Sequence, residues 1–275
     1  MKIVVCIPAR FASTRFPAKV LAKDTGKYLV QHVWEKACRA KLPHKVIIAT
    51  DDSRVVDAAK SFGAEVCLTS PDLQSGTDRI AQAVKSLDVD IVINLQGDEP
   101  EIEPSSIDFL ANLMLEAQNS KLKTKNFQMG TLAAPFQNAD QIADPAIVKV
   151  IVAYSVERRA GSIKLKTQNS KLKTDCGSAI YFSRSVIPYD RSAGGVGPIK
   201  NYLRHLGIYA YRKDFLLKIT KLPPSMLEKT ESLEQLRVIE NGFTILVGIV
   251  DKASTGIDTP DQYAEFVKRY KKAKN

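Results

Sequence analysis

The chain has 275 residues, of which 44% are hydrophobic and 25% charged, and its formal net charge is +10. This composition is typical of a globular protein and excludes wholesale disorder, and no apolar run approaches the ~18 residues that a membrane-spanning helix needs. The net charge alone would favour nucleic-acid binding, but 14 of the 40 basic residues lie in three segments that contain no acidic residue: 119–126, 158–174 and 268–275. The rest of the chain is slightly acidic, so we expect neither nucleic-acid binding nor stable membrane insertion.

The first half of the chain alternates short apolar segments with amphipathic ones. The expected strands are Lys2–Ile7, Lys45–Thr50, Glu65–Leu68 and Asp90–Leu95. The expected helices are Tyr28–Ala40, Val55–Ser61, Asp78–Leu87 and Pro104–Glu116. Fully apolar strands separated by amphipathic helices predict an α/β fold with a mostly parallel sheet covered by helices on both faces.

The second half is more mixed in its pattern. The expected strands are Ile147–Val152, Ser178–Ser183, Arg204–Tyr211 and Phe243–Val250, and the expected helices are Asp214–Ile219, Ser232–Asn241 and Thr259–Lys271. Gly242 is placed to stop a helix, and Pro260 is placed to start one. Because no linker rich in Pro, Gly or Ser interrupts the chain, we expect residues 1–275 to form a single domain with an inserted antiparallel portion.

Two basic insertions, near 118–126 and 158–174, share the string Gln-Asn-Ser-Lys-Leu-Lys-Thr. The string recurs irregularly and the rest of the chain does not follow it, which excludes a solenoid. We interpret both insertions as solvated loops. A polybasic surface for anionic lipid or nucleic acid is the alternative.

The four cysteines lie far apart and lack the spacing of metal ligands; they are Cys6, Cys38, Cys67 and Cys176. This usage predicts free thiols in a reducing compartment. The first residues contain too short an apolar run for a secretory signal. We therefore expect a cytoplasmic protein.

The loop after the first predicted strand, residues 8–19, contains Arg10, Arg15 and Lys19 among small residues. Ligands of open parallel sheets bind beyond the carboxyl ends of the strands, and such a loop lets cations and backbone N–H groups approach phosphates together. The loop is not a P-loop, because the Gly-Lys-Ser/Thr ending is missing, and it lacks the Rossmann glycine pattern. A solvated basic loop is the alternative interpretation.

Two acidic positions accompany this loop. Asp98 follows the predicted strand Asp90–Leu95, where it could hold Mg²⁺ at substrate phosphates or serve as a turn or capping acid. Gln96, beside it, can donate and accept hydrogen bonds, which suits a base or a sugar hydroxyl. Asp258 immediately precedes the last predicted helix and could be a plain N-cap.

Several segments, taken in order, resemble the signature of the 3-deoxy-manno-octulosonate (KDO) cytidylyltransferases. They are the loop 8–19, Ser75–Arg79, Gln96–Pro100, Tyr181–Arg184 with Ile187-Pro188, Arg204–Tyr209, Glu231–Arg237 and Gly256–Pro260. The resemblance implies a nucleotidyltransferase-type, Rossmann-like α/β fold and a homodimer. It also implies the Mg²⁺-dependent transfer of CMP from CTP to KDO, which yields CMP-KDO and pyrophosphate for lipopolysaccharide biosynthesis.

The same resemblance implies roles for individual residues. The catalytic residues would be Arg10, Lys19, Asp98 and Asp258, of which Asp98 and Asp258 would also be the metal ligands. The nucleotide-binding residues would be Ala9, Arg10, Ser13, Arg15, Lys19, Ser75, Gly76, Asp78, Arg79 and Gln96. The sugar-binding residues would be Gln96, Arg184, His205, Tyr209, Glu231, Glu234 and Gln235, with Arg184 binding the carboxylate. We expect Glu231 and Glu234, three residues apart on a predicted helix, to share one face.

The sequence departs from the family pattern at two places. Ala18 stands where the family commonly has glycine, and an alanine disfavours positive φ. The stretch between Val150 and Ser178, which is shorter in the family, contains copies of the basic string.

Two other functions remain open at this point. One is a cytidylyltransferase for another acidic sugar, such as 8-amino-8-deoxy-KDO or a sialic-type acid, because Arg184 would serve any 2-keto acid. The other is a non-catalytic basic binding module. Asp98 and Asp258 argue against it, because they would repel an anionic partner unless a metal ion were present.

Overall fold

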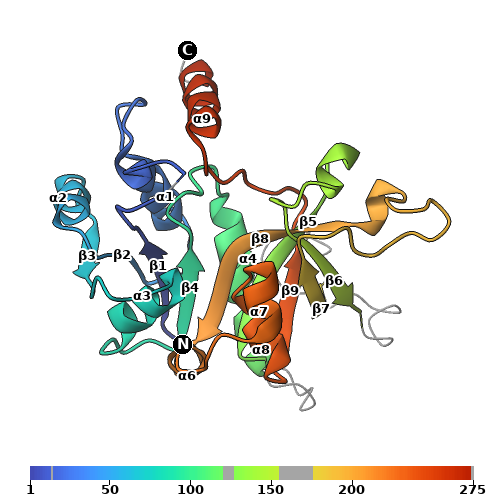
Figure 1. Ribbon diagram of the computed structural model, residues 1–275. Helices are drawn as coiled ribbons and strands as arrows, with labels where there is room; N and C mark the ends of the chain where they lie inside the picture. The colour runs from blue at the N-terminus through green and yellow to red at the C-terminus, as the bar shows by residue number, and fades with distance from the viewer. Residues whose placement is uncertain (14, 120–126, 155–175, 274–275) are drawn as a thin grey trace. The chain divides into compact units, whose positions relative to one another are not determined.

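The computed structural model describes residues 1–13, 15–119, 127–154 and 176–273. The chain divides into two compact units, Met1–Ala111 with Ser254–Asn275 and Asn112–Ala253 (Figure 1). Most of both basic insertions lies outside the described residues, so their interpretation as loops stays a prediction. The single-domain assignment also stays a prediction.

The first unit contains a parallel sheet with the strand order β3, β2, β1, β4. The strands are β1 (Ile3–Pro8), β2 (Lys45–Thr50), β3 (Glu65–Leu68) and β4 (Ile91–Leu95). Every residue of β1 and β4 is buried, as their apolar sequences predict. Parallel pairing places the carboxyl ends of β1 and β4 at the same edge, so the loops that follow them start side by side.

The helices of the first unit are η1 (Lys19–Leu21), α1 (Leu29–Cys38), α2 (Ser53–Ser61), α3 (Gly76–Val84) and α9 (Pro260–Lys272), and α4 (Pro104–Asn119) carries the chain into the second unit. Three helices of the first unit, α2, α3 and α9, begin at side-chain caps. Asp52 caps α2 by accepting a hydrogen bond from Arg54 N. Helix α9 packs Tyr263 and Phe266 against Leu29 and Ile257, which anchors the segment just before α9 to the body of this unit.

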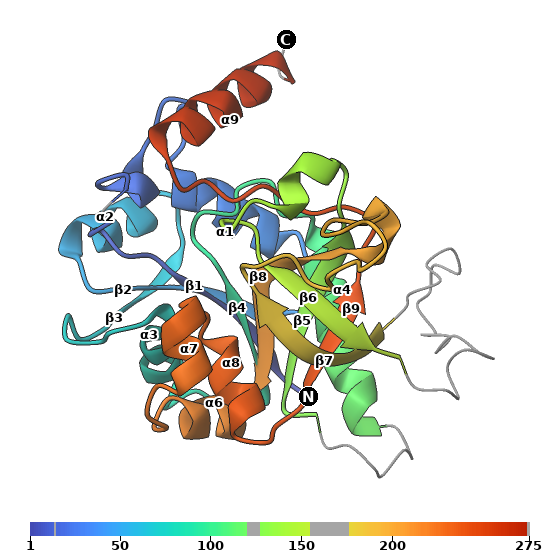
Figure 2. The ribbon, with the colours of Figure 1, turned by 45° about the vertical axis from the view of Figure 1, so that its right-hand side comes forward.

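The second unit contains a mixed sheet that closes on itself. Its strands are β5 (Met129–Pro135), β6 (Lys149–Ala153), β7 (Cys176–Ser183), β8 (Leu203–Arg212) and β9 (Ile245–Ile249). They follow the order β8, β5, β9, β7, β6, and β6 pairs back to β8 at Lys149 and Arg204, so the sheet forms a barrel-like ring (Figure 2). Among the described strands of this unit, only β5 and β9 are parallel.

The α/β class is therefore confirmed, and the parallel arrangement is found in the first unit. The prediction of a mostly parallel sheet covered on both faces is not confirmed for the chain as a whole, because the second unit has a mixed, closed sheet. Strand β5 was not predicted. Its sequence, Met-Gly-Thr-Leu-Ala-Ala-Pro, has neither strong alternation nor many β-branched residues, and the strand is stabilised by pairing with β8 and β9.

Helices of the second unit are short. They are η2 (Ala139–Ile142), η3 (Ile199–Asn201), α6 (Lys213–Ile219), α7 (Met226–Glu231) and α8 (Gln235–Glu240). The predicted helix Ser232–Asn241 is wrong at its start, because Ser232 has φ 53° and ends α7 in the left-handed conformation. Glu231 thus ends one helix and Glu234 precedes the next, so the prediction that they share a helix face is wrong. Gly242, with φ 78°, ends α8 as predicted.

In the described part of the chain, no helix combines the length and the apolar character needed to cross a membrane. The cysteines Cys6, Cys38, Cys67 and Cys176 are free thiols, as predicted.

Candidate active site

Lys19 joins three segments of the first unit that are far apart in the sequence. Its Nζ donates to Oδ2 of Asp98 at 2.6 Å and to the carbonyl oxygen of Ile257 at 2.7 Å, and it lies 3.4 Å from Oδ1 of Asp258. The Lys19 residue is only 8% exposed. A main-chain bond from Ile257 N to Asp98 O, 2.9 Å long, fixes the two acidic segments to each other. The structure thus brings three of the four predicted catalytic residues to one point.

Asp258 also pairs with Arg15, whose Nη2 lies 2.9 Å from Oδ1 of Asp258. The alternative interpretation of Asp258 as an N-cap is wrong. Thr259 caps α9 instead, accepting a hydrogen bond from Gln262 N, and Gln262 bonds back in a capping box. The Asp258 side chain, 45% exposed, is therefore directed at two cations and not at the helix end.

Tight backbone geometry brings these loops together. A Cβ at Gly97 would lie 2.8 Å from the carbonyl oxygen of Pro8, so only glycine allows the loop after β4 to approach the end of β1 this closely. Ala18, just before Lys19, adopts φ 54° and ψ 23°. The chain therefore keeps the left-handed conformation that alanine disfavours, at a cost of about 1 kcal/mol.

The residues present fit a divalent cation. Asp98 and Asp258 supply two partly exposed carboxylates within reach of a single ammonium group. The described residues hold no cluster of three or more His, Cys, Asp and Glu side chains suited to a metal ion. Magnesium commonly takes one or two carboxylates and completes its octahedron with phosphate oxygens and water, which matches this donor set.

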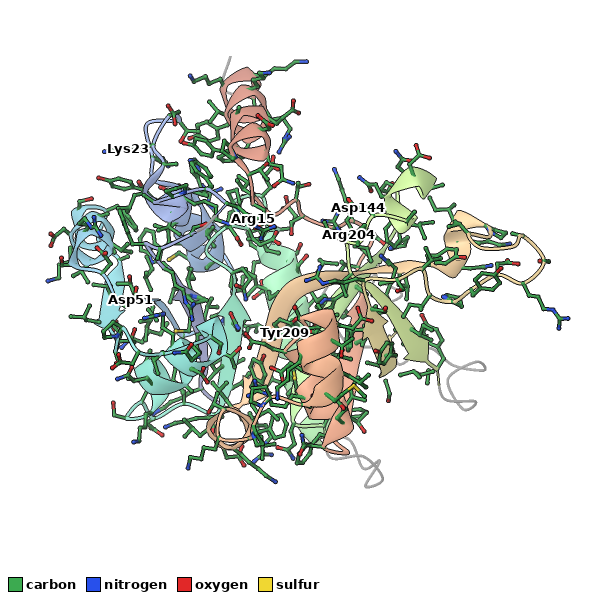
Figure 3. The ribbon with its side chains drawn as sticks, viewed as in Figure 1. Arg15, Lys23, Asp51, Asp144, Arg204 and Tyr209 are labelled. Atoms are coloured by element: carbon green, nitrogen blue, oxygen red, sulfur yellow. The ribbon has the colours of Figure 1, made fainter. Side chains whose placement is uncertain are left out.

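Arg79 is fully buried and joins the ends of two strands. Its guanidinium donates to Oγ1 of Thr69, beyond β3, and to Oδ2 of Asp51, beyond β2, at 2.7 Å (Asp51 is labelled in Figure 3). Burial lowers the pKa of Arg79, Asp51 opposes this shift, and the positive charge of Arg10 adds to it. The assignment of Arg79 to the nucleotide site stays a prediction.

Arg10 approaches the same region from the first loop. Its Nη2 donates to the carbonyl oxygen of Leu73 at 3.2 Å. In the described structure, the buried Nε atoms of Arg10 and Arg79 both lack a hydrogen-bond partner. Two neighbouring guanidinium groups with unused donors create a positive region suited to an anionic or carbonyl-bearing ligand.

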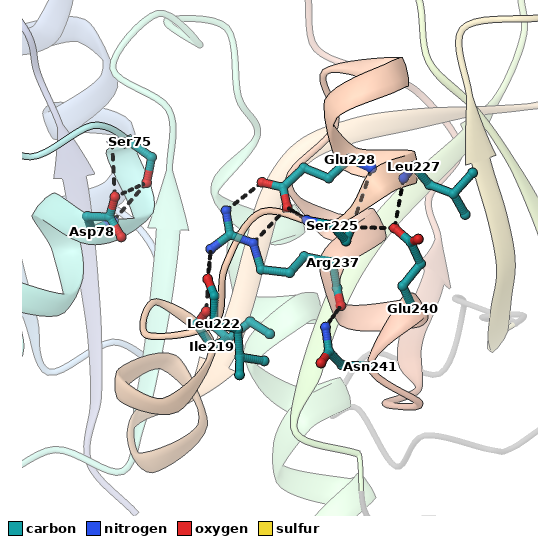
Figure 4. A network of polar contacts seen from close by, with 10 residues as sticks. All are labelled: Ser75, Asp78, Ile219, Leu222, Ser225, Leu227, Glu228, Arg237, Glu240 and Asn241. Carbon is teal, nitrogen blue, oxygen red and sulfur yellow. Dashed lines mark hydrogen bonds and ion pairs between the residues drawn. The ribbon is translucent and has the colours of Figure 1, made fainter.

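Ser75 and Asp78 use their side chains to start α3. Ser75 Oγ accepts from Asp78 N at 3.0 Å, and Oδ2 of Asp78 accepts from Ser75 N at 3.1 Å and from Ser75 Oγ at 2.8 Å (Figure 4). Gly76 lies against Pro8, which places this helix start beside the end of β1. Any nucleotide contact from this segment would therefore come mainly from its main chain.

The remaining predicted nucleotide residues flank the same strand ends. The main chain of Ala9 continues the β1–β2 ladder, with its N–H donating to Ala49 O at 2.9 Å. Gln96 directs its side-chain amide to Asn94 Oδ1 at 3.2 Å, and Ser13 is partly exposed in the first loop.

In the second unit, Arg184 and Glu231 hold each other through several bonds. The Glu231 carboxylate accepts from Arg184 N at 2.9 Å and from Ser183 Oγ at 2.6 Å. The Arg184 Nε donates to the carbonyl oxygen of Glu231 at 2.7 Å, and Nη1 donates to that of Pro145 at 2.9 Å. No bond from Nη2 is found among the described residues, so this side of the guanidinium fork can bind a carboxylate.

His205 is a buried, neutral histidine. It is 8% exposed, its ring packs edge-on against Phe182, and burial lowers its pKa to about 3. Its Nε2 lies 3.0 Å from Oγ1 of Thr131, which already donates its single hydrogen to Ile208 O at 2.7 Å. When the Thr131 hydroxyl donates to Ile208 O, the shortest of its contacts, Nε2 of His205 carries the proton and Nδ1 is an acceptor.

Tyr209, labelled in Figure 3, lies next to His205, with 5.4 Å between ring centroids. Its hydroxyl donates to Oε1 of Gln235 at 3.2 Å. Burial raises the pKa of Tyr209, and the exposed Glu234 raises it further. Gln235 is 4% exposed, and its Nε2 has no partner in the described structure, so a buried amide donor is available here.

The predicted residues fall into two sets. Those for the nucleotide and metal all lie in the first unit, whereas those for the sugar, apart from Gln96, lie in the second. Sequence reasoning missed Asp51, Thr131, the Glu228–Arg237 pair and the fully buried Lys149. For Lys149 a signal existed, because it is the single charged residue in the apolar run Ile147–Val152.

The Glu228–Arg237 pair joins α7 to α8, the helices that carry Glu231 and Gln235. The Arg237 guanidinium donates to both carboxylate oxygens of Glu228 and to the carbonyl oxygen of Leu222, and Glu240 binds the start of α7 (Figure 4). This network therefore fixes α7 and α8, and with them the predicted sugar-binding residues Glu231 and Gln235, to each other.

Comparisons with known proteins agree on one family. The sequence model described as "Cytidylyltransferase" matches residues 4–246. A 3-deoxy-manno-octulosonate cytidylyltransferase of Solibacter usitatus is 42% identical over 98% of this chain and 95% of its own length. The protein of the same name from Geobacter metallireducens is 41% identical over 98% of each chain.

Solved structures extend this similarity to the fold. A CMP:2-keto-3-deoxy-manno-octonic acid synthetase, solved in complex with CTP, superposes with a TM-score of 0.82 at 36% identity, covering 99% of this chain and 100% of that one. A 4-diphosphocytidyl-2C-methyl-D-erythritol synthase of Anaerococcus prevotii has a TM-score of 0.55 at 10% identity, covers 98% of this chain and 96% of that one, and shares the fold alone.

Proposed function

This chain belongs to the family of 3-deoxy-manno-octulosonate cytidylyltransferases, and from that premise we propose that it transfers CMP from CTP to KDO with release of pyrophosphate. The observation that carries this proposal is the meeting of Lys19, Asp98 and Asp258 at one point of the first unit. The product would supply lipopolysaccharide biosynthesis. The triphosphate of CTP is strongly anionic, and we expect it to be bound by the cations of the first loop, Arg10, Arg15 and Lys19.

The reaction would be an in-line attack by the anomeric hydroxyl of KDO on the α-phosphorus of CTP. The new bond joins the sugar oxygen to the α-phosphorus, the bond from the α-phosphorus to the oxygen that bridges to the β-phosphorus breaks, and the hydroxyl proton passes to solvent water. Catalysis of this kind depends mainly on positioning and charge neutralisation. Lys19 would stabilise the charge that accumulates on the departing pyrophosphate.

Asp98 and Asp258 would hold Mg²⁺. When bound, the ion would supply Lewis-acid stabilisation of the phosphate charge and favour ionisation of the attacking hydroxyl. The donor set supports this assignment, because two carboxylates leave room for phosphate and water ligands. Lys19, which lies between the two carboxylates, would then share them with the cation.

The sugar would be bound by residues of the second unit. Arg184 would bind the carboxylate of KDO through Nη2, while Tyr209, Gln235 and Nδ1 of His205 offer hydrogen-bond groups for hydroxyls. Glu231 orients Arg184 and, with Glu234, completes the predicted sugar-binding set. We also propose a cytoplasmic homodimer with a single domain per chain: the family resemblance supports the dimer, and the free cysteines support a reducing compartment.

The first experiment measures pyrophosphate release from CTP and Mg²⁺ with and without KDO. We expect release that requires both substrates and that stops when EDTA removes the metal. Parallel reactions contain 8-amino-8-deoxy-KDO or a sialic acid. Release with one of these sugars but not with KDO would change the substrate assigned to the protein. If the folded protein released no pyrophosphate with any of the sugars, the enzyme assignment would be contradicted.

A further inference from the structure

Lys149 is fully buried in the second unit, where it begins β6 and pairs in register with Arg204 of β8. A buried ammonium group is costly unless its hydrogens are bonded and its charge is compensated. The residue is not needed for the apolar packing of β6, since its neighbours in the run are valine and isoleucine. Its place in the fold therefore points to a role for its charge and its donors.

The Lys149 ammonium bonds to main-chain oxygens of two segments. It donates to the carbonyl oxygens of Asp144 at 3.0 Å and Ile147 at 2.7 Å, in the loop before β6, and to that of Arg184, after β7. Three donors thus meet three acceptors. Burial lowers the pKa of Lys149, the charges of Asp144 and Glu231 oppose this shift, and Arg184 adds to it.

Both segments that Lys149 binds determine where the guanidinium of Arg184 lies. One is residue 184 itself, which carries the guanidinium and whose main-chain carbonyl oxygen accepts from Lys149. The other is the loop 144–147, in which Pro145 accepts from Nη1 of Arg184. Figure 3 labels Asp144, at the start of this loop, and Arg204, the register partner of Lys149. Removing the ammonium would break, in one step, the bonds that join both segments to β6.

The charges around Arg184 also support a role for the Lys149 ammonium. Glu231 lies beside Arg184 and would repel a carboxylate ligand. The positive charge of Lys149 compensates the negative charge of Glu231. The positive charge of Arg184 is then available to attract the ligand's carboxylate. Asp144 is exposed, so solvent screens its carboxylate more strongly.

We propose that Lys149 is a positioning residue for the carboxylate of the acidic sugar: it fixes the backbone on both sides of Arg184 and offsets Glu231, so that the guanidinium fork meets the carboxylate in one orientation. The inference rests on the proposed function, which it deepens by naming the determinant of acid recognition. Lys149 itself does not contact the sugar.

The test compares two substrates, KDO and its C1 carboxamide, which is uncharged but similar in shape. The wild-type protein should prefer the acid. In Lys149→Met, kcat/KM for KDO should fall at least about tenfold, mostly through KM for the sugar, as expected for a weakened charged hydrogen bond. The carboxamide reaction and the KM for CTP should change by no more than about twofold, so the preference for the acid collapses.

Lys149→Gln retains two N–H donors but no charge, folds more readily than the Met variant, and should lose an intermediate part of the preference. Arg212→Gln is the control, a cation of the same unit at the end of β8 that pairs with Asp214. It should keep the ratio of acid to carboxamide turnover. Equal losses for acid and carboxamide in both Lys149 variants would overturn the role of Lys149. Absence of wild-type turnover of KDO would instead overturn the proposed function.

Discussion

Lys19 and Asp98 are 79 residues apart in the sequence, yet Nζ of Lys19 lies 2.6 Å from Oδ2 of Asp98. The pair is mostly buried on the lysine side, with side-chain exposures of 10% and 28%. The loops after β1 and β4 can meet here because both strands end at one edge of the parallel sheet. Asp98 is thus held by a cation and remains accessible to a ligand.

Asp98→Asn should abolish most turnover, because it removes one of two carboxylates available to a metal and the main partner of Lys19. We expect a loss of at least ~100-fold in kcat, the scale seen when one transition-state interaction is removed. Asp88→Asn is the control, since Asp88 also pairs with a lysine but has a side-chain exposure of 91%. Pyrophosphate release measures both variants, and near-wild-type turnover of Asp98→Asn would contradict the metal assignment.

Ala18→Gly should stabilise the protein. Glycine adopts the φ of 54° at this position without steric cost, which stabilises the folded state. Glycine also makes the unfolded chain more flexible, which opposes this gain but is smaller. The free energy of unfolding should therefore rise by about 0.5–1 kcal/mol. Ala143→Gly is the matched control, at an exposed alanine with φ −79°, and should lower that free energy by a similar amount. Urea denaturation measures both, and a decrease for both variants would show that Ala18 is not strained.

His205 should make the folded state sensitive to acid. Its pKa is about 3 in the folded state against an ordinary value of 6.5, so between these values the unfolded chain binds a proton that the native state does not. Stability is therefore lost as the pH falls from 6.5 toward 3, by at most about 1.4 kcal/mol per pH unit from this group. Urea denaturation at pH 7, 6 and 5 should show a shallower decline for His205→Gln. Parallel declines for variant and wild type would exclude His205 as the cause.

Arg237→Met should destabilise the second unit strongly. The Glu228 side chain, only 9% exposed, would be left without its cation, and breaking a buried pair in this way costs about 3–5 kcal/mol. The double variant Arg237→Met/Glu228→Gln should recover part of the loss, because it removes the uncompensated charge. Thermal unfolding compares the three proteins, and a double variant less stable than Arg237→Met would argue against charge burial as the cause.

The sequence was sufficient to place the strands and helices of the first unit, because β1, β2 and β4 are continuous apolar runs and α2 and α9 have clear N-terminal signals. It was also sufficient to select Lys19, Asp98 and Asp258, whose meeting needs only the strand order and α9. What could not be predicted depends on long-range pairing. Strand β5 has a weak local signal, and the closure of β6 on β8 joins residues 55 positions apart.

The surroundings of the predicted sugar-binding residues were harder to predict. The break at Ser232 has no local signature, because a serine with φ 53° is uncommon and is held by the packing of α7 and α8. For Asp258 the sequence allowed an N-cap, which the structure excludes because Thr259 caps α9; its role as a metal ligand stays a prediction. Lys149 was visible in the sequence as a charge in an apolar strand, but its acceptors are main-chain carbonyls, which a side-chain pattern does not encode.

The first unit is built from both ends of the chain, since Met1–Ala111 folds together with Ser254–Asn275. During synthesis, Lys19 and Asp98 emerge from the ribosome well before Ile257 and Asp258, the remaining partners of the Lys19 ammonium. The site is therefore completed only after Ile257 and Asp258 have been synthesised. A chain terminated before Ile257 would lack two of the three partners of the Lys19 ammonium and the second carboxylate, so it should be inactive toward CTP.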